Sequence, residues 1–126
     1  MEVTYVRATI SEELLDAIDE SIYLQLELHI IDGKINKAEA DNNEGFANHL
    51  RKIHSNIIKQ HKEINDHLRQ NGIKIHEVEV LDDMFVQYKY HQKINGGFKE
   101  GYNRYWRQAI KFKLNNRMKR HFGGDS

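Results

Sequence analysis

The spacing of apolar residues changes abruptly at Asn71–Gly72, and this change constrains the fold more than any other feature of the chain. Between residues 44 and 71, apolar side chains recur at steps of three and four, the spacing of one helix face. Between residues 73 and 93 they mostly alternate with polar side chains, which is the spacing of a strand. Asn-Gly is a strong signal for the end of a helix. The sequence therefore predicts a helix followed directly by a sheet.

The segment after this turn is predicted to form an antiparallel hairpin. Its apolar phase shifts near His76–Glu77, which predicts a β-bulge, and Asp82–Asp83 is the expected tight turn. A further turn signal, NGG at 95–97, makes a short third strand near Phe98 an open alternative. Residues 3–9 are rich in β-branched and aromatic side chains, so we expect a short strand there that joins the hairpin.

The first helix is predicted from its N-terminal cap. Ser11 precedes Glu12 and Glu13, and a serine followed by two acids suits the positive end of a helix dipole. We expect this helix over residues 11–31, with Gly33 as its C-cap. Apolar and polar residues also alternate within 23–36, which fits a hairpin, and the sequence leaves that alternative open.

The last helix is predicted over residues 102–121, where apolar or aromatic side chains recur every four residues. Trp106 is expected in the core, and residues 122–126 are expected to form a frayed tail. Together these elements predict a single α+β domain over residues 1–126. We expect a small antiparallel sheet, made of strand 3–9 and hairpin 73–93, packed with helices 11–31, 44–71 and 102–121.

Charge is distributed unevenly along a chain whose net charge is zero. Residues 1–84 hold 9 Lys or Arg against 17 Asp or Glu, whereas residues 85–126 hold 10 against 2. Either the two halves neutralise each other, in the fold or across a homodimer, or the basic half binds an anion such as nucleic acid. The candidate nucleic-acid-binding residues are Lys99, Arg104, Arg107, Lys111, Lys113, Arg117, Lys119 and Arg120.

These two interpretations differ in what mutation should do. If the basic cluster only balances charge, changing Arg117 and Arg120 to Gln should lower stability by about 1 kcal/mol or less. If it binds phosphates, the same change should weaken nucleic-acid binding and its salt dependence. Tyr88 and Tyr90, on the second predicted strand, could stack on bases, but we favour packing of that face on the helices.

Signatures of catalysis and metal binding are missing from the sequence. Cysteine is absent, which excludes thiolate ligands and Cys nucleophiles. The segment NGGFKEG lacks the Gly-Lys-Ser/Thr of a P-loop, and no serine lies in a nucleophile-elbow context. The histidines of the second helix (His49, His54, His61 and His67) are not spaced three or four residues apart, so no metal site is predicted. We expect no enzymatic activity, no metal and no cofactor.

The remaining features concern location and role. No apolar run approaches the roughly 18 residues of a membrane span, the first ten residues do not resemble a secretory signal, and no disulfide is possible. We therefore expect a cytoplasmic protein, and its richness in Lys, Ile and Asn suits an AT-rich bacterial or phage genome. The expected function is a non-enzymatic protein-interaction or regulatory module that self-associates, with nucleic-acid binding through the basic, aromatic C-terminal helix as the alternative.

Overall fold

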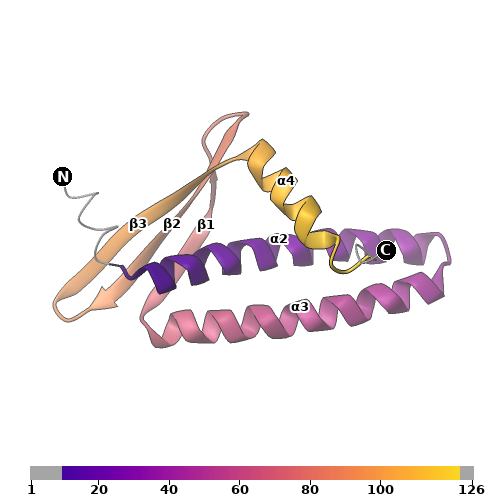
Figure 1. Cartoon of the computed structure of the whole chain (residues 1–126), viewed down its shortest axis with the longest axis horizontal. Helices are drawn as coiled ribbons and strands as arrows, with labels where there is room; N and C mark the ends of the chain where they lie inside the picture. The colour runs from indigo at the N-terminus through magenta and orange to yellow at the C-terminus, as the bar shows by residue number, and fades with distance from the viewer. Residues whose placement is uncertain (1–9, 123–126) are drawn as a thin grey trace.

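The computed structural model describes residues 10–122 and shows a helical hairpin joined to a three-stranded sheet (Figure 1). The predicted strand at 3–9 and most of the predicted tail lie outside the described residues. In chain order the elements are α2 (Glu12–Ala40), α3 (Glu44–Gln70), β1 (Ile73–Val80), β2 (Phe85–Ile94), β3 (Gly97–Trp106) and α4 (Arg107–Met118). The predicted α+β class, with three helices and an antiparallel sheet, is confirmed.

The first helix begins where it was predicted and ends later. The Ser11 side chain accepts a hydrogen bond from the backbone N–H of Leu14, as an N-cap does. The helix then continues through Gly33 to Ala40, so the C-cap predicted at Gly33 and the hairpin alternative for 23–36 are both wrong. The alternating apolar residues have another cause, which is that this part of α2 is buried on two sides. Leu24 packs against α3, whereas Leu26 packs against the core beneath the sheet.

The helices α2 and α3 are joined by a short turn and run antiparallel. Asn42 adopts a left-handed conformation in the turn, with a φ of 58°, and Asn43 caps α3 by accepting from the N–H of Phe46. Buried residues of α3 repeat at the predicted three- and four-residue steps, and the helix ends at Gln70, directly before the Asn-Gly signal. Gly72 then takes a φ of 76°, which few other residues adopt.

The sheet is an antiparallel meander in the order β1-β2-β3. The register shifts between Ile75 and Val78, which confirms the predicted bulge. Between β1 and β2 the Asp82 carboxylate accepts from the N–H groups of Met84 and Phe85, both at 2.8 Å, so the turn also lies where it was predicted.

The third strand is longer than predicted and replaces the start of the last helix. β3 pairs with β2 along its whole length, up to Phe85 opposite Trp106. The helix predicted over 102–121 therefore begins at Arg107, and the prediction for residues 102–106 is wrong. Trp106 ends the strand with 49% of its surface exposed, so its predicted place in the core is also wrong.

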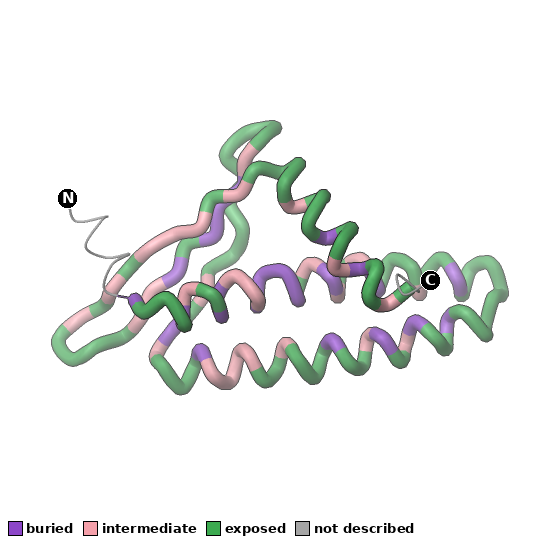
Figure 2. The backbone as a smooth tube through the Cα atoms, in the orientation of Figure 1, coloured by how far each residue is buried: buried purple, intermediate pink, exposed green. Residues whose placement is uncertain are grey.

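Two hydrophobic cores share α2. Figure 2 shows buried positions along β2 and along the facing sides of α2 and α3. The first core joins the N-terminal half of α2 to the sheet, and the second fills the helical hairpin and receives Met118 from α4. No helix of the described part of the chain is long and apolar enough to cross a membrane.

Candidate functional site

The predicted basic residues are distributed over two elements and more than one face. Lys99 and Arg104 lie on β3 rather than on the last helix, and their positions differ by an odd number of residues, so they belong to opposite faces of the sheet. Arg107, Lys111, Lys113 and Arg117 lie on α4, and Lys119 and Arg120 follow it. The structure brings the side of α4 that carries Lys113 and Arg117 against α2.

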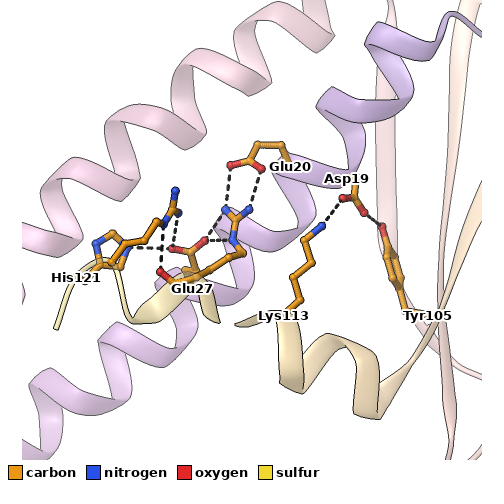
Figure 3. A network of polar contacts seen from close by, with 8 residues as sticks. Asp19, Glu20, Glu27, Tyr105, Lys113 and His121 are labelled. Carbon is orange, nitrogen blue, oxygen red and sulfur yellow. Dashed lines mark hydrogen bonds and ion pairs between the residues drawn. The ribbon is translucent and has the colours of Figure 1, made fainter. Parts of the chain in front are cut away.

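Arg117 makes the most extensive of these contacts, which are drawn in Figure 3. Its two terminal nitrogens donate to the two carboxylate oxygens of Glu20 at 2.8 and 2.9 Å, and its Nε donates to Glu27. Glu27 is fully buried, and the Arg117 side chain is only 12% exposed. His121 and Arg120 approach the other oxygen of Glu27 at 3.1 and 3.9 Å. The arrangement supplies a buried carboxylate with cationic and hydrogen-bonding partners.

A second contact between α4 and α2 lies about two turns of α2 nearer the sheet. Lys113 lies 3.1 Å from Asp19, whose carboxylate also accepts a 2.6 Å hydrogen bond from the Tyr105 hydroxyl. The Lys113 ammonium lies 4.4 Å from the centroid of the Tyr23 ring, close enough for a cation–π interaction. We call these contacts, together with those of Arg117, the α2–α4 lock.

The α2–α4 lock changes the titration of its members. The hydrogen bond from Arg117 holds the pKa of Glu20 below its ordinary value, against the opposing effect of partial burial. Burial, reinforced by the hydrogen bond to Asp19, raises the pKa of the Tyr105 hydroxyl. Part of the opposite charge in the two halves of the sequence is thus used to hold α4 on α2.

Other predicted basic residues stay at the surface. Arg107, Lys111 and Lys119 are exposed and have no ionic partner within residues 10–122. Arg104 is exposed as well, but it donates to the side-chain oxygen of Gln87 at 3.1 Å. The predicted set therefore contains side chains that balance charge inside the fold and side chains that remain accessible to a ligand.

A groove of about 820 Å³ opens between α2, α3 and the first strand. At its base the buried Ser21 hydroxyl donates to the Asn65 side-chain oxygen at 2.7 Å, and the Asn65 amide nitrogen lies 3.2 Å from Nε2 of His61. The serine contacts an amide and not an imidazole, so this trio lacks the contact that activates a nucleophile. Burial lowers the pKa of His61, which favours the neutral ring that this hydrogen bond requires.

The helical histidines behave as individual side chains. His54 lies 3.0 Å from Asp32, and His67 lies 3.5 Å from Glu13. Within residues 10–122 no group of three or more His, Cys, Asp or Glu side chains has the geometry to hold a metal ion. Of the four helical histidines, His54 and His67 thus each pair with a single acid.

The sheet has an outer face that the sequence analysis did not identify. Tyr88 and Tyr90 are buried in the first core, as favoured from the sequence, which places the alternate residues of the second strand on the opposite side. The paired residues of β3 on that opposite side include three aromatics, namely Phe98, Tyr102 and Trp106. We call this side the outer sheet face. Tyr102 and Trp106 lie four residues apart, so they were mistaken for the start of a helical repeat.

Exposed apolar side chains gather at the tip of the sheet and on α4. The backbone N–H of Arg107 donates to the carbonyl of Met84 at 2.8 Å, so α4 starts directly beside the turn between the first two strands (Figure 1). We call this region the apolar corner. It consists of Val78, Val80, Leu81, Met84 and Phe112, whose exposed fractions are 46, 65, 43, 54 and 71%.

The family model described as YhjD protein matches residues 9–126. The chain belongs to this family. No curated protein and no solved structure matches the chain. In this YhjD family member, the groove, the outer sheet face, the apolar corner and the exposed basic side chains of α4 are open to a partner, whereas the α2–α4 lock is engaged within the fold.

Proposed function

We propose that the chain is a non-enzymatic interaction module that forms homodimers through the apolar corner. The observation that supports this proposal is the exposure of five large apolar side chains, four on β1 and the turn after it and one on α4, up to 71% for Phe112. Exposed apolar residues gathered in one region are a common mark of an interaction surface. Burying them against a partner would remove apolar area from water, at about 25 cal/mol per Å².

A second copy of the chain suits this corner because acidic and basic side chains both flank it, so two copies of the surface can pair opposite charges. Asp82 and Asp83 form the turn at the tip, and Arg107 and Lys111 lie at the start of the helix beside it. In a two-fold arrangement the same patch meets itself, so the acidic turn of each copy can face the basic helix start of the other. The apolar residues between them would then be covered.

The test is sedimentation equilibrium at tens of micromolar protein. We expect a dimer of the 14.9 kDa chain for the wild type and a monomer for the double variant Met84→Ser with Phe112→Ser. The matched control is Ile58→Ser, because Ile58 is 47% exposed on α3 and lies outside the corner. A wild-type monomer at this concentration, or a dimer that only Ile58→Ser disrupts, would contradict the proposal.

Nucleic-acid binding through the C-terminal helix stays a prediction. The structural observation in its favour is that Arg107, Lys111 and Lys119 are exposed and lack ionic partners within the described chain. Electrostatic binding by these side chains should be insensitive to sequence and should weaken steeply as salt rises. The test is a titration of duplex DNA with the wild type and with the double variant Lys111→Gln, Lys119→Gln. Equal affinity of the two proteins for DNA would exclude binding through this helix.

A further inference from the structure

The outer sheet face presents a row of separated aromatic rings. Phe98, Tyr102 and Trp106 follow one another at four-residue steps on β3, which corresponds to about 13 Å between successive side chains. At that distance the rings do not cover one another. Phe98 is 60% exposed and Trp106 is 49% exposed, so a planar ligand can reach both. Such a row offers several stacking positions along one strand.

Side chains between the rings hold them in place. Arg104 lies between Tyr102 and Trp106 in the strand, and its guanidinium lies 5.3 Å from the centroid of the Tyr102 ring. Gln87 fixes this arginine by accepting its hydrogen bond at 3.1 Å, while Glu79 accepts from the Gln87 amide at 3.0 Å. At the other end of the row the ring of His91 packs edge to face with Phe98, at 5.1 Å between centroids. Two of the three rings, Tyr102 and Phe98, therefore contact neighbouring side chains before any ligand binds.

The charge of this face favours an anionic ligand. Lys89 is paired with Tyr102 and Lys93 with Phe98 in the sheet register, so each lysine lies opposite an aromatic residue of the neighbouring strand. Arg104 adds a third positive charge between the rings. The acidic residues paired into the same face are Glu79 and Glu100, and the first of them lies 3.7 Å from Lys89. Exposed rings flanked by Lys and Arg match the two parts of a nucleotide, its base and its phosphate.

We propose that the outer sheet face binds single-stranded nucleic acid. Bases stack on Phe98 and Trp106, while the phosphates lie along Lys89, Lys93 and Arg104. A duplex does not suit this surface, because its bases are already stacked on one another and cannot reach a flat sheet. This site differs from the basic helix surface predicted from the sequence. It also lies on the opposite side of the sheet from Val78 and Val80 of the apolar corner.

Trp106 is the only tryptophan of the chain, so its fluorescence reports directly on this face. The experiment titrates the full chain with the single-stranded homopolymers oligo(dT) and oligo(U), each at two salt concentrations. We expect saturable quenching of Trp106 and weaker binding at higher salt. Phe98→Ala should weaken binding at least about fivefold, the lower limit for loss of one stacked base, while Trp106 remains as the probe. Phe98→Tyr should restore it.

The matched control is Phe46→Ala, which removes an exposed aromatic side chain from α3, outside both the outer sheet face and the apolar corner, and should leave the affinity unchanged. A thermal melt of Phe98→Ala should match the wild type, because the side chain is mostly exposed. Absence of quenching at low salt and 100 µM or so of oligonucleotide would overturn the proposal. So would tighter binding of duplex than of single strands, or equal weakening by Phe46→Ala. Sedimentation equilibrium of Phe98→Ala separates the nucleic-acid proposal from the dimer proposal. The variant should form the same dimer as the wild type even though it binds single strands more weakly.

Discussion

Glu27 is a carboxylate with no exposed surface, and this gives its partner Arg117 a large energetic role. A buried ion pair gains little over apolar packing, but removing one partner leaves a charge that water cannot reach. The sequence analysis assigned about 1 kcal/mol or less to the loss of Arg117 and Arg120 because both were treated as surface charges. The acid they contact is 90 residues away from Arg117, so no local pattern indicates its burial.

The first prediction follows from this burial. Arg117→Gln should lower the free energy of unfolding by about 3 kcal/mol, because Glu27 loses its nearest cation. Arg120→Gln is the control, since that side chain is 56% exposed and lies 3.9 Å from the same acid, and it should cost less than about 1 kcal/mol. Urea denaturation of the two variants measures the difference. Equal small losses would mean that water reaches Glu27.

At the scale of the elements, the sequence predicts boundaries that depend on local chemistry. The helix start at Ser11, the Asn-Gly junction and the bulge are all where their residues indicate. The prediction of a boundary fails where packing between residues distant in the sequence determines it. The end of α2 is such a case, because Ile31 and Ala38 pack against α3 and this burial outweighs the weak helix propensity of Gly33.

The second prediction tests this helix. Gly33→Ala should stabilise the protein by about 0.5–1 kcal/mol, because alanine restricts the unfolded chain and favours a helix interior. A methyl group on Gly33 would meet no atom within 4 Å. If Gly33 were instead a C-cap in the left-handed conformation, Gly33→Ala would lower the free energy of unfolding. Thermal unfolding of the variant decides between them, and a lower melting temperature would indicate that α2 ends near residue 31.

The wrong boundary of α4 has a geometric reason. A step of four residues keeps side chains on one face of a helix, but four is also a multiple of two, so it keeps them on one face of a strand. Tyr102 and Trp106 satisfy both periods, and pairing with β2 selects the strand. The aromatic row of the outer sheet face was hidden by this ambiguity. Its basic neighbours Lys89 and Lys93 come from another strand, so only the sheet register reveals the site.

At the scale of the whole molecule, the two cores are joined by shared elements. Ile64 of α3 packs against both cores, and α4 contributes Ile110 to the first and Met118 to the second. The α2–α4 lock lies between these two contacts of α4. A substitution that breaks the α2–α4 lock or either core should therefore lower the free energy of unfolding of the entire described chain.

The last prediction concerns acid. The folded pKa of His61 is below its ordinary 6.5, so as the pH falls from 6.5 the unfolded chain takes up a proton first, and stability decreases until the folded ring is also protonated. The folded pKa of Glu20 is below its ordinary 4.5, so a second decrease should begin as the pH falls below 4.5. Urea denaturation at a series of pH values should show both steps. His61→Gln should remove the upper step only, and Glu20→Gln the lower step only, because the two groups belong to the groove and to the α2–α4 lock respectively. An upper step that persists in His61→Gln and disappears in Glu20→Gln would contradict this assignment.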